Sequence, residues 1–314
     1  MRVASLRYLI LRLVRASATL MAVVALVFVL VRLVPGDPVR AMLGDQASPE
    51  DRAQLRRNLH LDRPLPQQLG SFVADLRAGS WGYSFRRPQT TVRSLVDEAL
   101  PHTLELAAAS LLLSWLFALP LGVLAGVYRE RSLDRLSSAA SLIGAALPAI
   151  WLGPLLLWLF CLNVRALPLP GDDEASPWLR LLLPSLTVAL GLAALLVRHL
   201  RAEVGKIMQT LFIHAARARG LPRSRVVWVH ALRNALLPIV TVSAAQLGAL
   251  LSGALVTEKI FERPGLGTLL LEAFFARDFP VIQGCVLMTS GFYVLVNLLL
   301  DLSYVWIDPR IRLQ

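Results

Sequence analysis

Cysteine is scarce in this sequence, and the shortage excludes proteins held together by disulfide bonds or by cysteine-bound metals. The 314 residues include two cysteines, Cys161 and Cys285, and both lie within long apolar runs. Two widely separated cysteines in such surroundings are typical of small buried hydrophobic side chains. We therefore expect no disulfide and no metal site built on them.

Lysine is almost absent, which bears on nucleotide binding. The chain contains only Lys206 and Lys259, against 30 arginines. A phosphate-binding loop of the form G-x-x-x-x-G-K-[ST] requires a lysine followed by serine or threonine. Lys206 is followed by Ile207, and Lys259 follows Glu258, so neither fits. The sequence predicts no ATP site and no cofactor in this chain.

Catalytic groups are also few. An enzyme that works within a membrane would need paired acids, or a nucleophile with a base, at membrane depth. Asp301 lies at the end of the last apolar run, and Asp308 follows in the tail. Ser114 and Ser252 have no evident partner, and no His-x-x-x-His pattern occurs. We therefore expect that the chain is not an enzyme.

Long apolar runs are what the sequence does have. Hydrophobic residues make up 56% of the chain, and the mean hydropathy is +0.60. A membrane-spanning helix needs roughly 17–25 apolar residues, and six runs without Asp, Glu, Lys or Arg meet or approach that length. These runs are Ala16–Val31, Leu106–Tyr128, Leu136–Val164, Leu181–Val197, Ala235–Thr257 and Val281–Leu300. Because barrel strands are shorter and alternate in polarity, the runs predict an all-α membrane protein with six transmembrane helices. Pro148 and Pro154 should kink or break the third helix.

The first run and the short loops indicate how the chain is oriented. The run is longer than the apolar core of a signal peptide and lacks a following cleavage site, so an uncleaved anchor is favoured. With the N-terminus inside, the cytoplasmic loops and ends carry 17 Lys or Arg, and the opposite short loops carry 5. The positive-inside rule then places both termini in the cytoplasm. It also explains the net charge of +11 without a nucleic-acid partner.

By polarity, the chain falls into three stretches. Residues 1–34 form a cytoplasmic arm and the first helix, 35–98 form an external region, and 99–314 form a core of five helices.

The external region is expected to be partly helical. Ser48, Pro49 and the acids that follow are typical of a helix start, and this helix should continue to about Leu59. A second helix is expected over Gln67–Arg77, and Gly79–Ser84 should form a turn or an extended segment.

The cytoplasmic loop 198–234 contains a basic segment with a helix break in its middle, HAARARGLP. Leu211–Arg219 is compatible with a short helix, and Gly220 stands where a helix C-cap prefers a left-handed residue. Pro222 suits the first turn of a new helix leading into the fifth span, and Pro238 should break or kink that helix. A short helix of this kind is suited to project toward a partner protein. An ordinary solvated loop explains the spacing equally well.

Several motifs, in order along nearly the whole chain, resemble one family of membrane proteins. The residues from His214 to Gly220 are similar to the EAA loop of ATP-binding cassette (ABC) importer permeases. The wider stretch ARARGL…HALRNALLP resembles the dipeptide, oligopeptide and nickel permeases of that group. The further matching motifs are Leu33–Pro38, Leu61–Leu65, Gly82–Ser84, Glu258–Phe261, Pro264–Gly267, Arg277–Gln283 and Asp308–Arg310. His214 is a departure, because the general pattern has Glu there.

The resemblance implies the type I ABC importer permease fold in the bacterial inner membrane. It also implies that a short coupling helix docks into a cytoplasmic ATPase and transmits the closure of the ATPase to the membrane helices. The residues implied in this contact are His214, Ala215, Ala216, Arg217, Arg219, Gly220 and Leu221. The implied partners are a second homologous permease, two cytoplasmic ABC ATPases that bind ATP and Mg²⁺, an extracytoplasmic substrate-binding protein and membrane lipid.

Polar residues within the spans are candidates for the translocation pathway, because they are costly in lipid and usually face protein or water. We expect Gln246, Leu250 and Asn297 to line the pathway. A hydrogen bond between helices explains the presence of Gln246 and Asn297 within spans at least as well. The candidates for docking or gating on the external side are acidic: Asp37, Glu258 and Asp278.

Taken with its resemblance, the sequence predicts a permease subunit of an ATP-driven importer. The expected substrates are di- or oligopeptides, or nickel or metal chelates, delivered by the binding protein. The residues do not choose among dipeptides, longer peptides, glutathione and nickel or its chelates. An ATP-independent carrier or channel is the alternative and would transport alone, whereas a scaffold would bind partners without substrate-dependent ATP turnover.

Overall fold

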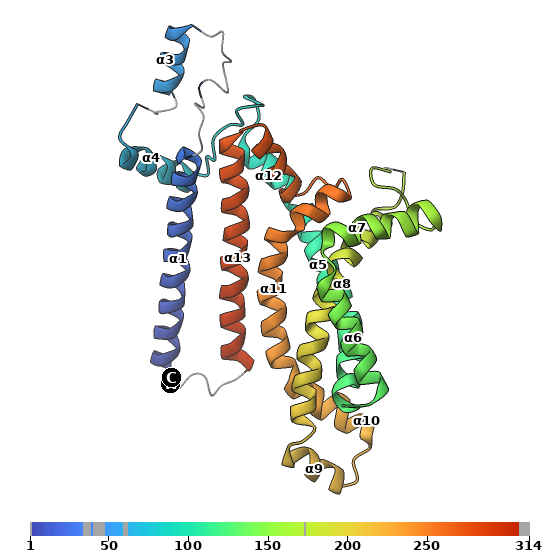
Figure 1. Cartoon of the computed structure of the whole chain (residues 1–314). Coiled ribbons are helices and arrows are strands. Elements are labelled where there is room, and N and C mark those ends of the chain that lie inside the picture. Colours follow the sequence, from blue (N-terminus) through green and yellow to red (C-terminus); the bar gives the residue numbers. More distant parts are fainter. Residues whose placement is uncertain (1, 34–38, 40–47, 59–61, 173, 308–314) are drawn as a thin grey trace. The chain divides into compact units, whose positions relative to one another are not determined.

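The structure is a computed structural model that describes residues 2–33, 39, 48–58, 62–172 and 174–307 (Figure 1). Among these residues there is no strand, and one isolated antiparallel bridge joins Tyr83 to Thr91. The chain forms two compact units, which are described separately. Unit 1 is Met1–Thr103 with Pro264–Leu298, and unit 2 is Leu104–Arg263 with Leu299–Gln314.

Within the described residues, five helices are long and apolar enough to cross a membrane. They are α1 (Arg2–Leu33), α5 (Val92–Val127), α8 (Pro177–Ile207), α11 (Leu232–Ile260) and α13 (Phe279–Ile307). Each contains one of the predicted apolar runs, or nearly all of it, and extends beyond it. Charged and polar residues are added at the helix ends, where they need not lie in the hydrocarbon core of a bilayer.

The third predicted span is a bent pair of helices. Helix α6 (Ser132–Ala146) is followed by α7 (Ala149–Leu157), which continues into the π-helix η1 (Trp158–Asn163), and the two halves are bent by 100°. Leu147 is extended, with ψ 112°, because the residue before a proline disfavours the α-helical region. The break predicted at Pro148 is therefore confirmed, and the described residues contain up to six spans if the bent pair is counted as one. Pro154 lies inside α7 and does not end it.

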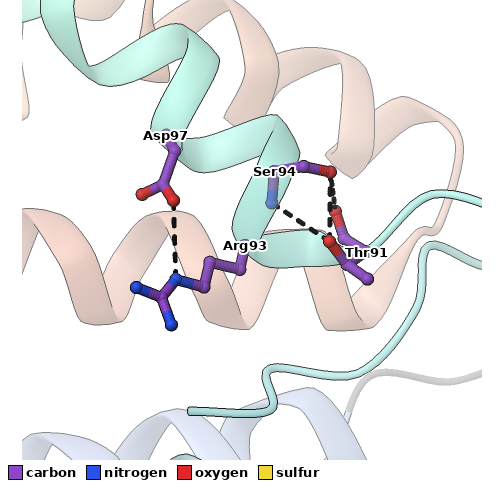
Figure 2. A network of polar contacts seen from close by, with 4 residues as sticks. All are labelled: Thr91, Arg93, Ser94 and Asp97. Carbon is purple, nitrogen blue, oxygen red and sulfur yellow. Dashed lines mark hydrogen bonds and ion pairs between the residues drawn. The ribbon is translucent and has the colours of Figure 1, made fainter.

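Helix α5 begins fourteen residues before its apolar run, because polar residues cap its start (Figure 2). The backbone N–H of Ser94 donates to Oγ1 of Thr91 at 3.2 Å. From the same first turn, Arg93 reaches Asp97, four residues further on, in an ion pair at 3.5 Å along the exposed side of the helix. These local interactions stabilise a first turn that hydropathy alone does not reveal.

Unit 1 joins the described part of the region predicted to be external to the N-terminal part of α5. The expected helices are present as α3 (Pro49–Asn58) and α4 (Leu65–Arg77). Ser48 caps α3, since its Oγ accepts a hydrogen bond from the N–H of Asp51 at 3.1 Å. The core of the unit packs α5 against α12 (Leu266–Phe275) and α13. Its buried residues are Val92, Leu95, Val96, Ala99, Leu266, Ala273, Val281 and Cys285.

In unit 2, α5 and α8 approach each other closely. A Cβ atom added at Gly126 would lie 2.8 Å from Cβ of Val204 and 2.9 Å from the backbone oxygen of Arg201. One at Gly122 would lie 2.6 Å from Cβ of Leu200. The two glycines form a G-x-x-x-G pattern, which lets membrane helices approach closely. This pattern is visible in the sequence and was missed there.

Candidate coupling site

The basic segment of the loop 198–234 folds as the short helix α9 (Leu211–Ala218) and a sharp corner. Gly220 has φ 76°, and its N–H donates to the carbonyl of Arg217 at 2.9 Å. The N–H of Leu221 reaches back to the carbonyl of Ala216 at 3.4 Å. The helix ends one residue earlier than expected, and the left-handed conformation predicted for Gly220 is confirmed.

Helix α9 is anchored in the core of unit 2 mainly by Ile213 and exposes most of its other side chains. Ile213 is completely buried in the main core cluster of the unit, with Ala216 and Leu221 packed beside it. Leu211 is 86% exposed and Phe212 is 45% exposed. The remaining exposed residues of the corner are His214, Ala215, Arg217, Ala218, Arg219 and Gly220. The helix lies at one end of unit 2, at the bottom of the view in Figure 1.

The chain after the corner differs from the expectation in two respects. Pro222 is not in the first turn of the next helix but caps it, with ψ 144°, and α10 (Arg223–Arg225) follows. The π-helix η2 (Val226–Ala231) then leads directly into α11. Pro238 lies inside α11 and does not break it, and a kink there stays a prediction. A proline removes one backbone hydrogen bond, and the apolar packing around α11 continues on both sides of it.

The structure places the three pathway candidates in different settings. Gln246 is half-buried in α11 and Leu250 is buried, both within unit 2. Asn297 belongs to unit 1, and its side-chain amide donates to the carbonyl of Tyr293, one turn earlier in α13, at 2.8 Å. This bond lies within one helix, not between two. A role of these residues in the pathway stays a prediction.

Of the three acidic candidates predicted for the external side, two lie within the described residues, and both are buried. Asp37 lies outside the described residues, and Glu258 is completely buried near the end of α11. Asp278 is also buried. Both side chains are enclosed by the protein in this structure, and a role of either residue in docking stays a prediction. Gating by either remains a prediction.

Asp278 holds the turn at residues 84–87 against the corner between α12 and α13. Its carboxylate accepts hydrogen bonds from the hydroxyl of Ser84, from the N–H of Phe85 at 3.1 Å and from the N–H of Arg86 at 3.3 Å. The hydroxyl oxygen of Ser84 in turn accepts from the N–H of Arg87 at 3.0 Å. These segments are more than 190 residues apart in the sequence, so the contact could not be predicted from local patterns.

The surface around this turn is aromatic and basic, a feature that the sequence analysis missed. A cavity of about 280 Å³ is lined by Phe85, Arg86, Ala276 and Arg277. The rings of Phe274 and Phe275 lie edge to face, with their centroids 5.9 Å apart, and the two side chains are 63% and 77% exposed. We call these six residues the aromatic–basic patch. Exposed apolar side chains gathered in this way commonly mark an interaction surface.

The described part of the chain contains no group of three or more His, Cys, Asp or Glu side chains placed to hold a metal ion.

Comparison with known proteins identifies the relatives of the chain. Residues 118–313 match the family described as binding-protein-dependent transport system inner membrane component, and residues 5–107 match its N-terminal companion. The chain is 38% identical, over 98% of its length and 99% of the relative, to the glutathione transport system permease protein GsiC of Pectobacterium atrosepticum. It is 37% identical over the same shares to GsiC of Escherichia coli K12.

A solved structure has the same fold. The MetNI methionine ABC transporter, in an inward-facing conformation, superimposes with a TM-score of 0.58 at 19% identity. The match covers 69% of this chain and 97% of that one. The predicted all-α permease fold of type I importers is confirmed.

Proposed function

The chain belongs to the family of inner membrane components of binding-protein-dependent transport systems, and from this premise we propose how it works and what it carries. It is the permease subunit of an ABC importer. In our proposal α9 is its coupling helix, both chain termini are cytoplasmic, and a second permease and two ATPases that bind ATP and Mg²⁺ complete the transporter. The binding protein delivers substrate from the other side of the membrane.

One observation supports the coupling role: α9 exposes most of its side chains while the buried Ile213 holds it in place. Leu211 and Phe212 expose apolar surface next to Arg217 and Arg219, at a helix that Ile213 holds to the core. Apolar and arginine side chains at one spot are typical of contact residues at the centre of a protein interface. In our proposal Leu211 enters a cleft on the ATPase, and the two arginines face its acidic side chains. His214 stands where the general motif has an acid, so the contact here does not need a carboxylate.

For the external side, we propose that the aromatic–basic patch receives the binding protein. Asp278 is buried and bonded to the turn, so the neighbouring arginines Arg86 and Arg277 give this surface its positive charge. Phe274 and Phe275 supply apolar area beside them. An acidic rim around an apolar spot on the binding protein would match it.

The proposed substrate is a small peptide, with glutathione as the first candidate. Relatives that are 37–38% identical over nearly the full chain carry the name of glutathione permeases. A tripeptide also falls within the di- and oligopeptide class that the motifs suggest. Nickel and metal chelates have no comparable support among these relatives.

The coupling role is tested by copurification of the affinity-tagged chain from its native membrane in mild detergent. We expect a second permease and ATPase chains in the eluate, with ATP hydrolysis that vanadate inhibits. Leu211→Ser should lower the amount of ATPase recovered about tenfold, because losing one buried leucine contact costs about 1.5 kcal/mol or more. Leu169→Ser is the matched control, since Leu169 is 51% exposed in the loop after η1. Equal recovery from both variants would contradict the proposed docking face.

The substrate is tested in vesicles that contain the purified transporter. We expect uptake of radiolabelled glutathione that requires both ATP and the binding protein. Uptake of a dipeptide or of Ni²⁺ in its place would overturn the glutathione proposal and retain the importer. Uptake by the chain alone without ATP would instead support the carrier alternative.

A further inference from the structure

We propose that Tyr128 and Asp134 are positioning residues that tie the turn between α5 and α6 to the coupling corner. The α5–α6 turn is defined as Tyr128–Arg131, and the coupling corner as α9 with α10. In this proposal the turn moves with the corner, so that α5 and α6 are displaced together with α8 and α11. The inference rests on the proposed coupling role of α9.

The first tie joins the α5–α6 turn to α8. Asp134, in the first turn of α6, is buried and forms an ion pair with Arg201 of α8, in which Nε of Arg201 donates to one carboxylate oxygen and Nη2 to the other at 2.9 Å. One of these oxygens also accepts the N–H of Glu130 at 2.8 Å. Glu130 is left-handed, with φ 66°. A single carboxylate therefore fixes both the strained turn and the neighbouring helix, and removing it would leave Arg201 and the turn without their acceptor.

The second tie joins the same turn to the coupling corner. The guanidinium carbon of Arg223 lies 4.7 Å from the ring centroid of Tyr128, within the range of a cation–π contact. Arg131 lies over the same ring at 5.7 Å. Arg223 is the first residue of α10, three positions after the left-handed Gly220. The contact thus joins the coupling corner to the α5–α6 turn, which lies far from it in the sequence.

Close packing makes the tied elements stiff. Gly122 and Gly126 bring α5 against the backbone of α8, and a Cβ added at Gly144 of α6 would lie 3.2 Å from Cβ of Ala194 in α8. Helices in contact at these distances have little freedom to slide past one another. Without the ties, displacement of α9 would pass into α8 on one side and through η2 into α11 on the other, and it would reach α5 and α6 only through their packing on α8. The ties add a direct connection to the α5–α6 turn and hence to the bent pair α6–α7.

The test measures whether the turn and the corner move together in the complete transporter. Spin labels are placed at Ser132→Cys, at the start of α6, and at Ser224→Cys in α10, both of which replace exposed serines. The native cysteines Cys161 and Cys285, both buried, are replaced by alanine in this background. The distance between the labels is then compared in the nucleotide-free and the ATP–vanadate-trapped complex. For the otherwise unchanged chain we expect one narrow distribution that is the same in both states.

Two variants break the ties one at a time. Asp134→Asn removes the charge that binds Arg201, and Arg223→Gln removes the cation over Tyr128. Arg223 is exposed, so its replacement leaves no unpaired buried charge and keeps the test valid if Asp134→Asn does not fold. In each variant we expect the label distance to shift between the two nucleotide states. Glu203→Gln is the control, because it breaks an ion pair with Lys206 on α8 (2.7 Å) that ties no second helix.

Each outcome decides the inference. A shift in the variants with none in the control supports it. A shift already present without either variant, or no shift in Asp134→Asn and Arg223→Gln, overturns it while the coupling role of α9 stands. If no ATPase copurifies with the unchanged chain, the proposed function fails first and takes this inference with it.

Discussion

Two corners in this molecule turn the chain through the same left-handed backbone conformation, but they are held in opposite ways. In unit 2 the turn after α9 uses Gly220, with φ 76°, and a Cβ atom added there would meet no other atom within 4 Å. In unit 1 the turn between α12 and α13 uses Arg277, with φ 53°, and the next residue is the buried Asp278. The glycine of the first corner stands in open space, whereas the second corner is held by a carboxylate with three donors.

The difference indicates that the first corner serves to bind a partner and the second serves to hold the fold together. An exposed corner on one apolar anchor presents a surface that a partner must complete, and its conformation depends on what glycine permits. A corner whose hydrogen bonds are supplied by its own buried carboxylate needs no partner to hold its conformation. Its outer side can therefore expose arginines and aromatic residues. The two corners should therefore respond differently to the same kinds of substitution.

The largest effect is expected from Asp278→Ala. The hydroxyl of Ser84 and the amides of Phe85 and Arg86 would lose their acceptor in a buried site, at a cost of about 3 kcal/mol. We expect a clear fall in the melting temperature of the chain in detergent and a lower yield of folded protein. Asp172→Ala is the control, since Asp172 is exposed and its side chain accepts the N–H of Glu174, at 3.2 Å, within one exposed turn. Equal melting temperatures for the two variants would show that the carboxylate does not brace this corner.

A smaller effect, confined to coupling, is expected from Gly220→Val. The site is open, so the cost is that of the left-handed backbone alone, about 1–2 kcal/mol, or more for a β-branched residue. We expect normal membrane insertion and an ATP-driven uptake reduced roughly 5- to 30-fold, the change in population that such an energy produces. Gly220→Asn should retain most of the uptake, because asparagine tolerates this conformation. Normal uptake by a well-expressed Gly220→Val variant would contradict the need for a left-handed corner.

The contrast between the corners also shows which features could be read from the sequence. The cap at Ser48, the break at Pro148 and the left-handed Gly220 depend on neighbouring residues, and all three are present in the structure. Hydropathy located the spans for a similar reason, since each run must by itself be long enough to cross a bilayer.

Features that depend on distant residues were not predicted. Asp278 was predicted as a docking or gate residue, and its hydrogen bonds to residues 84–86 were not predicted because those residues lie far away in the sequence. Asp134 was passed over, and only its pairing with Arg201 distinguishes it from an ordinary acid in a first helical turn. The bend at Pro148 was expected, but not that the two halves would diverge by 100°. The direction in which a helix continues after a break, and the pairing of side chains that are distant in the sequence, are set by packing between helices. Local sequence patterns do not encode this packing.

The smallest effect on stability, and the sharpest test of the contrast, is expected from Arg277→Gly. Glycine would relieve the left-handed strain but would add freedom to the unfolded chain, and the two changes nearly cancel, to within about 1 kcal/mol. The melting temperature should therefore stay almost unchanged. Binding of the substrate-binding protein should nevertheless weaken, by up to about fivefold, because an exposed charge pair contributes about 0.2–1 kcal/mol. Arg277→Lys keeps the charge and should bind as the unchanged chain does. A large loss of stability in Arg277→Gly, with binding unaffected, would show that the arginine serves the corner and not the surface.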